Sequence, residues 1–344
     1  MMRSNPDADL VTVIVPVYNV RPFLREALDS VIHQTYPRLE IIVVDDGSED
    51  GSGEICDAYA AADPRIAVIH QRNQGLSAAR NAGLERMHGQ ALAFLDSDDA
   101  YCPAMIETMV NAMHREDADV VVCKHADLRT ERRMVAPRAA RKQPPLSPGL
   151  YPRVEAMRAL ADQRLDMSVW NKLYRAELWR DLRFPPGRVY EDVTVAWPLL
   201  GNSARICVLP DLLYLHRIRT GSITASDNMQ FSKDELTAWL EYESFIQRNV
   251  PEIFSGDQLL KARQSRLRFL ISYYCRYARG DMRREEKERI RQWVLSVGRD
   301  VPARKCSTLI RYSWHMLCHR PGLLRALYPI FKLFRNGIRL ALNR

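Results

Sequence analysis

Residues 91–99 read ALAFLDSDD, an apolar run that ends in three carboxylates among four residues. An apolar run this short, bounded by polar turn residues, is typical of a strand buried in a parallel sheet. Because parallel sheets bind ligands beyond the carboxyl ends of their strands, we expect the acidic cluster in a ligand crevice. Carboxylates this close repel one another unless a hard divalent cation, water or backbone donors compensate them. The stretch therefore predicts a metal site, and the alternative is that Asp98 or Asp99 only caps the helix that begins near Pro103.

Strand and helix patterns alternate on both sides of this run. The expected strands, rich in β-branched and aliphatic residues, cover 10–17, 39–44, 65–70, 90–95 and 118–123. The expected helices cover 21–34, 53–62, 76–87 and 103–115. Such alternation predicts an α/β fold with a doubly wound, mainly parallel sheet. The sequence contains neither G-x-G-x-x-G after the first strand nor G-x-x-x-x-G-K-[ST], so these two modes of phosphate binding are excluded.

The composition is that of a globular protein with an excess of basic residues. The 344 residues are 47% hydrophobic and carry a formal net charge of +8, which suits anionic partners without distinguishing nucleic acid, phospholipid and sugar nucleotides. Seven cysteines without a C-x-x-C pair indicate neither a zinc site nor a disulfide framework. The N-terminus lacks a signal-peptide core, and no apolar run reaches about 18 residues. We therefore expect a cytoplasmic protein, with peripheral attachment to the inner face of the cell membrane left open.

Four short motifs follow one another in the first half of the chain. They are VPVYN at 15–19, VDDGS at 44–48, NQGLSAARNAG at 73–83 and FLDSDD at 94–99. In this order and spacing they resemble family 2 glycosyltransferases of the GT-A fold, closely to about residue 125 and more loosely to about residue 225. The resemblance implies inverting transfer of a sugar from a nucleotide diphosphate donor, preferentially a UDP-sugar, to a hydroxyl of a glycan or lipid-linked acceptor. It also implies a role in surface polysaccharide synthesis.

The resemblance assigns the nucleobase of the donor to the ends of the first two strands. Pro16, Tyr18 and Asn19 would form a wall for the base. A carboxylate at Asp45 or Asp46 would accept the imide proton of uracil, and two adjacent acids leave the choice open. The alternative for these acids is an Asx-turn, because Asp-Gly-Ser is also a favourable turn sequence.

Two further motifs are assigned to the sugar nucleotide and its metal. Arg80 and Asn81 open a helix after a glycine-bearing loop, where they would hold phosphate or ribose oxygens; a solvated helix arginine is the alternative. Asp96 would lie near the ribose, and Ser97 is counted with it among the residues that bind the nucleotide sugar. Asp98 would bind a divalent metal, Mn²⁺ or Mg²⁺, that bridges the diphosphate and offsets charge on the departing nucleotide.

Inversion needs a base on the face opposite the leaving group, and the second half of the chain offers one. Glu191 and Asp192 begin an apolar helical run, where the helix dipole favours their charge. The resemblance places the base in this pair; we assign it to Asp192, with Glu191 orienting the acceptor or its partner acid, and an acidic cap without chemistry is the alternative. The resemblance also matches His216 to a metal ligand, and Arg219 and Ser222 to the diphosphate. An ordinary structural histidine is the alternative for His216.

A basic helical region follows these motifs. We place a catalytic domain at 1–226, with a nucleotide-sugar-binding half at about 1–125 and an acceptor and catalytic-base half at about 150–226, and a helical C-terminal region at 227–344. Residues 301–344 contain nine arginines or lysines, no Asp or Glu, and interleaved aromatic and aliphatic residues. This pattern predicts docking on an anionic membrane surface, and the alternative is packing on the catalytic domain or on a second subunit.

A basic nucleic-acid-binding module without catalytic activity is the alternative function. Only positive charge and aromatic residues favour it, since neither a recognition helix nor an RNA-binding fingerprint is recognisable. The ordered acidic motifs favour the enzyme, and nucleic acid is not expected as a partner. Release of nucleotide diphosphate from a panel of nucleotide sugars, with manganese present, would separate the two functions.

Overall fold

The structure is a computed structural model with two compact units. It describes residues 9–129, 134–135, 144–162, 164–218 and 229–253, and then 260, 263–264, 267, 271, 274, 284–299, 301, 308–320 and 323. The units are Met1–Pro251 and Glu252–Arg344, so they divide within the short 3-10 helix η3 (Pro251–Ile253). The sequence-based division at 226–227 lies before α7 (Met229–Asn249), which belongs to the first unit.

Ten strands of the described chain form one sheet. In spatial order they include β3 (Ile66–His70), β2 (Leu39–Asp45), β1 (Val11–Val17), β4 (Ala91–Phe94), β9 (Lys172–Arg175), β6 (Val120–Arg129), β10 (Arg205–Ile218) and β5 (Ala100–Tyr101). In addition, β7 (Met134–Val135) pairs with β6, and β8 (Gly149–Pro152) pairs with β10. The strands β1 to β4 are parallel, as the alternation predicts, and β6 is parallel to β10. The other strands, including β9 between β4 and β6, are antiparallel to their neighbours, so the α/β sheet is mixed.

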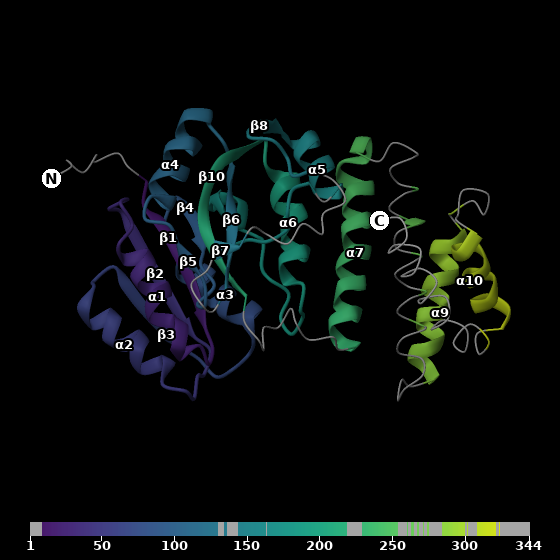
Figure 1. Ribbon diagram of the computed structural model, residues 1–344, viewed down its shortest axis with the longest axis horizontal. Helices are drawn as coiled ribbons and strands as arrows, with labels where there is room; N and C mark the ends of the chain where they lie inside the picture. The colour runs from purple at the N-terminus through teal and green to yellow at the C-terminus, as the bar shows by residue number, and fades with distance from the viewer. Residues whose placement is uncertain are drawn as a thin grey trace. The chain divides into compact units, whose positions relative to one another are not determined.

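Helices cover both faces of the parallel part of the sheet (Figure 1). The crossover helices are α1 (Arg21–Ile32), α2 (Ser52–Ala62), α3 (Leu76–Arg86) and α4 (Met105–Glu116). Val13 and Val15 of β1 share a core with α1, α2 and α4. Ile14 points to the other face, where a Cβ on Gly83 of α3 would lie 2.6 Å from it. Glycine therefore lets α3 approach β1 closely, and α3 carries Arg80 toward the carboxyl ends of the strands.

Three helices and a short 3-10 helix build the second half of the first unit. They are α5 (Arg153–Ala161), η1 (Ala176–Trp179), α6 (Glu191–Asn202) and α7. A Cβ on Gly201 of α6 would lie 2.6 Å from the ring of Phe245 in α7, so these two helices pack closely (Figure 1). Tyr190, in the left-handed conformation at φ 64°, turns the chain into α6. This turn brings the predicted acid pair to the start of a firmly packed helix.

The described part of the second unit contains α9 (Arg284–Arg299) and α10 (Thr308–His319). Gly298 of α9 lies against the indole of Trp314, and Leu317 is fully buried. Some apolar residues of the predicted membrane-docking segment are therefore interior, while the side chains of Arg311, Tyr312, His315, Arg320 and Leu323 are exposed. Residues 324–344 of that segment lie outside the described residues. Of the helices that the structure describes, none combines the length and the apolar character needed to cross a membrane.

Candidate active site

The carboxyl ends of β1 and β2 bring two of the motifs together. Val17 at the end of β1 pairs with Asp45 at the end of β2. Tyr18 follows β1 and is nearly half exposed, and Asn19 has a left-handed φ of 50°. Pro16 is buried inside β1, so Tyr18 and Asn19 are the exposed members of the predicted wall for the nucleobase.

Asp45 is buried and closes the turn that follows β2. Its Oδ1 accepts the N–H of Ser48 at 3.0 Å, which is the side-chain turn considered as the alternative to base binding. Its Oδ2 lies 2.9 Å from Nδ1 of His70, and the other ring nitrogen of His70 lies 2.9 Å from Asp57. Hydrogen bonds to Asp57 and Asp45 raise the pKa of His70. Binding of a uracil imide by Asp45 remains a prediction.

Asp46 is buried and fastens the loop that leads into α3. It accepts hydrogen bonds from Gln71 Nε2 at 2.6 Å, from the Gln74 N–H at 2.9 Å and from the Gly75 N–H at 2.8 Å. Gly75 is the N-cap of α3 and has a positive φ of 88°. The carboxylate therefore fixes the start of α3, the helix that carries Arg80.

Arg80 is the centre of the site. Its side chain is 1% exposed, Nη1 donates to Glu191 at 2.8 Å and to Asp192 at 2.7 Å, and Nη2 donates to Asp96 at 2.9 Å. Burial works against the charge of the guanidinium, but the three carboxylates prevail and raise the pKa of Arg80. The alternative of a solvated helix arginine is wrong. The two terminal nitrogens, which were predicted to face phosphate or ribose, donate to carboxylates from two distant parts of the chain.

Glu191 and Asp192 occupy the first turn of α6, as predicted. Their side chains are 13% and 21% exposed, so Asp192 is the more accessible of the two. Oδ2 of Asp192 also accepts the Val169 N–H at 3.2 Å. Burial and the charge of Asp192 outweigh Arg80 and raise the pKa of Glu191 to about 7. Asp192 is thus held by two donors, and Glu191 beside it readily takes up a proton.

Asn81 is used within the protein. Its Nδ2 donates to the Phe184 carbonyl at 2.8 Å, and its Oδ1 accepts the Phe184 N–H at 2.9 Å. The ring of Phe184 then lies 5.1 Å from the guanidinium carbon of Arg80. The structure therefore places the amide of Asn81 on a neighbouring backbone, where it supports Arg80, rather than at an open edge.

The acidic loop after β4 turns sharply. The Asp99 N–H donates to the Asp96 carbonyl at 2.9 Å, Ser97 and Asp99 are buried, and Asp96 and Asp98 are partly exposed. Burial, opposed by Arg80 and reinforced by Asp192 and Asp98, raises the pKa of Asp96. Residues 96–116 are all described, the N-cap of α4 is Ala104, and the side chain that accepts a first-turn N–H of this helix is Gln34, whose Oε1 lies 3.0 Å from the Ile106 nitrogen. The alternative that Asp98 or Asp99 only caps this helix is therefore wrong.

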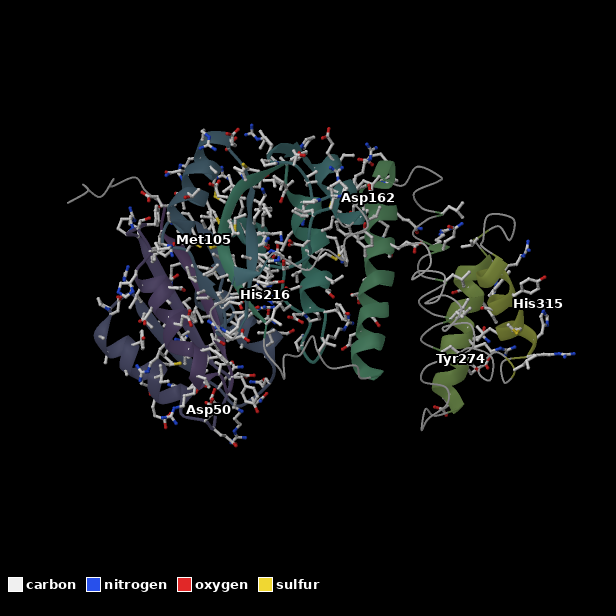
Figure 2. All side chains as sticks on the ribbon, viewed as in Figure 1. Asp50, Met105, Asp162, His216, Tyr274 and His315 are labelled. Atoms are coloured by element: carbon white, nitrogen blue, oxygen red, sulfur yellow. The ribbon has the colours of Figure 1, made fainter. Side chains whose placement is uncertain are left out.

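His216 lies near the end of β10 (Figure 2). Its side chain is partly exposed. Its Nδ1 is 3.1 Å from Asp127 Oδ1, and its ring stacks on Trp170 at 5.4 Å and 7°. A carboxylate on one ring nitrogen orients the other, as is usual for metal-binding histidines. Arg219 and Ser222 lie outside the described residues.

The donor set around Asp98 fits a divalent metal only when a ligand completes it. Within the described ranges, no group of three or more His, Cys, Asp or Glu side chains is placed to hold an ion. Mg²⁺ and Mn²⁺ are commonly bound by one or two protein side chains together with phosphate oxygens. Asp98 precedes Asp99, and His216 precedes Arg217, whose N–H donates to Asp99 and whose Nε donates to the Asp98 carbonyl. Two side chains from this cluster, together with a diphosphate, would suit that mode of binding.

The buried Lys172 holds the loop that precedes β9, residues 166–171. Lys172 Nζ donates to Asp166 at 2.9 Å, to the Ser168 carbonyl at 2.5 Å and to Asn171 Oδ1 at 2.8 Å. Burial opposes the charge of Asp166, but Lys172 lowers the pKa of this carboxyl. All three protons of the ammonium group are used. The loop thus presents the Val169 N–H to the acid pair and the Trp170 ring to β10.

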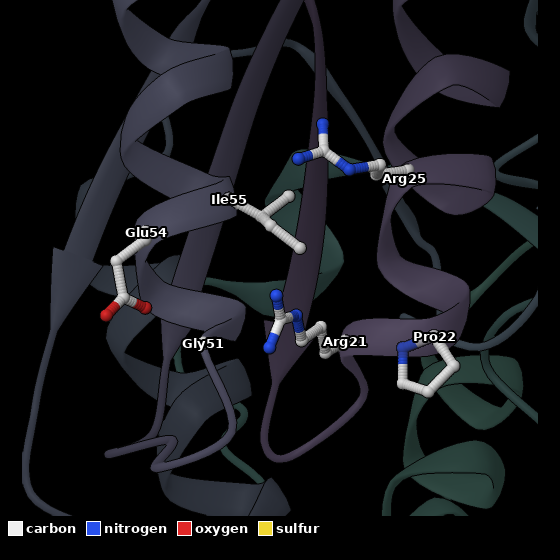
Figure 3. Close-up of a pocket in the computed structure, with 6 residues that line it drawn as sticks. All are labelled: Arg21, Pro22, Arg25, Gly51, Glu54 and Ile55. Carbon is white, nitrogen blue, oxygen red and sulfur yellow. The ribbon is translucent and has the colours of Figure 1, made fainter.

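A cavity in the described chain lies away from these residues. It has a volume of about 610 Å³ and lies between the N-termini of α1 and α2. Figure 3 shows Arg21 and Arg25 reaching across it toward Ile55. None of the predicted site residues lines it. The carboxylate cluster around Arg80, rather than this cavity, is the candidate active site.

Several residues around the cluster were not predicted. Asp99, Asp127, Trp170 and Arg217 touch the predicted residues or their neighbours. The only local signal was the acidity of the loop that contains Asp99. The other three become recognisable once β6, β9 and β10 are known to be adjacent.

Comparison with known proteins identifies the family. The profile of glycosyl transferase family 2 matches residues 12–183, which is half of the 344-residue chain. The chain belongs to this family. Its identity to Glycosyltransferase GlyA of Streptococcus pneumoniae serotype 4 is 38% over 225 residues, or 63% of this chain and 32% of GlyA. The uncharacterized glycosyltransferase EpsJ of Bacillus subtilis is 35% identical over 224 residues, or 62% of this chain and 63% of EpsJ. This family 2 chain thus spans about a third of GlyA and less than two thirds of EpsJ.

Solved structures show that this family 2 chain has the GT-A fold. The structure of S. aureus TarS 1–349 in complex with UDP-GlcNAc has a TM-score of 0.66 and 21% identity, and the match covers 95% of this chain and 92% of TarS. The mannosyltransferase PcManGT from Pyrobaculum calidifontis, in complex with GDP-Man and Mn²⁺, has a TM-score of 0.55 and 18% identity, covering 94% and 88%. The prediction of an α/β GT-A fold with a helical C-terminal part is confirmed.

Proposed function

We propose that this chain is an inverting glycosyltransferase that moves a sugar from a nucleotide diphosphate donor, preferentially a UDP-sugar, to a hydroxyl of a glycan or lipid-linked acceptor. The observation that carries the proposal is the ion cluster of Arg80 with Asp96, Glu191 and Asp192. It joins the loop after β4 to the start of α6. Asp96, which the proposal places near the donor, and the candidate base Asp192 thus bind the same guanidinium. Direct displacement at an anomeric carbon requires the donor and the base to be this close.

In this proposal Asp192 is the base. It accepts the proton of the acceptor hydroxyl as that oxygen attacks the anomeric carbon, while the bond to the diphosphate breaks on the opposite face. The Val169 N–H and Arg80 hold the carboxylate from two sides, which leaves it one narrow range of orientations. Glu191, bound to the same guanidinium nitrogen, orients the acceptor. Supporting this division of roles, Asp192 is the more exposed acid.

Tyr18, Asn19 and one of the two acids Asp45 and Asp46 are proposed to hold the nucleobase, with Asp96 near the ribose. Asp98 and His216 are proposed to hold Mn²⁺ or Mg²⁺ together with the diphosphate. When bound, such an ion would neutralise charge on the leaving nucleotide. The PcManGT complex, which has the same fold, contains GDP-Man and Mn²⁺ and so supports a divalent metal, but not the choice of ligands. The residues of this chain would still position both partners and receive the proton.

We also propose that the enzyme works in surface polysaccharide synthesis at the cytoplasmic face of the membrane. Arg311 and Tyr312 of α10 and Arg320, directly after this helix, are exposed and could meet an anionic surface. Exposed basic and aromatic side chains favour such contact. This attachment would be peripheral and reversible.

A donor screen tests the proposal. The full chain is incubated with UDP-, GDP- and dTDP-sugars and Mn²⁺, and released nucleotide diphosphate is measured. We expect release from at least one donor and loss of turnover in Asp192→Asn. The control is Glu155→Gln, which changes an exposed acid in the first turn of another helix, α5. If no donor is consumed while the protein binds nucleic acid, the proposal is wrong and the binding-module alternative replaces it.

A further inference from the structure

Arg217 joins the acidic loop to two other elements. Its Nε donates to the main-chain carbonyl of Asp98 at 2.7 Å, and its Nη2 donates to Glu26 of α1 at 2.7 Å. The guanidinium also lies 5.1 Å from the ring centre of Phe23 in α1. Its side chain is 4% exposed. Arg217 therefore ties the peptide of Asp98 to a packed helix without occupying the carboxylate of Asp98 through these bonds.

Asp99 binds the same stretch of β10 from the other side. Its Oδ1 accepts the Arg217 N–H at 2.6 Å, and its Oδ2 accepts the Tyr214 hydroxyl at 2.7 Å. His216 lies between these two anchors in sequence. Leu215 of β10 also pairs with Ala100 of β5, the residue after Asp99, and this pairing joins the same two segments. The acidic loop and the segment 214–217 are thus held to each other by side-chain and main-chain bonds.

We propose that Arg217 and Asp99 are positioning residues that hold Asp98 and His216 at the fixed separation needed to share one divalent metal. The inference rests on the proposed function, in which these two residues are metal ligands. A site with two protein ligands binds an ion well only when both ligands are already in place, because otherwise ordering them costs free energy. Arg217 fixes the peptide that carries Asp98, and Asp99 fixes the strand that carries His216.

Metal binding tests this role separately from catalysis. The full chain, saturated with UDP, is titrated with Mn²⁺, and free Mn²⁺ is followed by its electron paramagnetic resonance signal. For Arg217→Met we expect Mn²⁺ affinity to fall ~10–100-fold, the range seen when supports of metal ligands are removed. Asp99→Asn should give a fall in the same direction, because one of its two acceptor oxygens is lost.

Arg65→Met is the matched control. Arg65 also donates to a backbone carbonyl, that of Ile32 at 2.8 Å, and to a carboxylate, that of Asp63 at 2.6 Å, but none of its printed partners belongs to the acidic loop. We expect its Mn²⁺ affinity to equal that of the unmodified chain. Melting curves of all variants show whether a loss of affinity is only a loss of fold.

Three outcomes are decisive. If Arg217→Met stays folded and binds Mn²⁺ within about twofold of the unmodified chain, the inference is overturned. If Arg217→Met does not fold, Glu26→Ala takes its place, because it removes only the half-exposed anchor on α1, and unchanged affinity then overturns the inference. If the unmodified chain binds no Mn²⁺ with UDP and consumes no donor, the proposed function itself is wrong.

Discussion

Replacing Arg80 with methionine should destabilise the first unit by about 3 kcal/mol at neutral pH. Arg80 is 1% exposed and lies 2.7, 2.8 and 2.9 Å from oxygens of Asp192, Glu191 and Asp96. Removing one partner of a buried ion pair costs about 3–5 kcal/mol, because the remaining charge is left uncompensated. The three acids are 13–26% exposed, so some water reaches them and we take the lower end of that range.

The loss should depend on pH in a defined direction. Burial and neighbouring acids raise the pKa of Asp96, and they raise that of Glu191 to about 7. When the folded-state pKa of a group exceeds its unfolded value, its contribution to stability is complete below the unfolded value and is lost as pH rises through the folded value. Without the guanidinium these two pKa values rise further. The stability of the variant should therefore approach that of the unmodified chain near pH 5, roughly the unfolded-state pKa of these acids. The difference in stability should be largest above about pH 7.

Urea unfolding, followed by circular dichroism and tryptophan fluorescence at several pH values, measures both effects. Arg65→Met is the control, because its ion pair with Asp63 is partly exposed and should be worth less than about 1 kcal/mol. A loss below about 1 kcal/mol for Arg80→Met, or a loss that does not shrink toward low pH, would refute the reasoning. In that case the guanidinium would not be what compensates the acids.

Three further predictions concern activity and membrane contact. Asp98→Asn should remove most turnover and weaken Mn²⁺-dependent nucleotide binding in a folded protein, which calorimetry checks; full activity in excess chelator would contradict the metal assignment. Asp192→Asn should lower turnover by ~10²–10⁴-fold and leave donor affinity near normal, because the lost interaction belongs to the transition state. An active Asp192→Asn beside an inactive Glu191→Gln would move the base to Glu191. Replacing Arg311 and Arg320 with glutamine should weaken co-sedimentation with anionic vesicles by about 1 kcal/mol per charge at low salt, and equal binding would exclude α10 from the contact.

The sequence by itself determined the order of strands and helices in the first half of the chain. The apolar run Val11–Val17 and the amphipathic pattern of Arg21–Ile32 are local features of the sequence. The first forms a strand and the second a helix, as the spacing of their apolar residues predicts. The motif acids could likewise be placed at strand ends, because parallel strands end at one edge. These features depend on residues that are near one another in sequence, and therefore a single sequence is enough to predict them.

The tertiary structure alone decided what those acids touch. Asp45 ends β2 and Asp46 follows it, yet Asp45 closes the turn after this strand while Asp46 holds the loop before α3. Arg80 meets Glu191 across 111 residues, a pairing that no local period encodes. Which charges share a buried site depends on how β4, α3 and α6 pack. Burial then makes that pairing obligatory, because an unpaired charge in the same place would cost several kcal/mol, about 3–5.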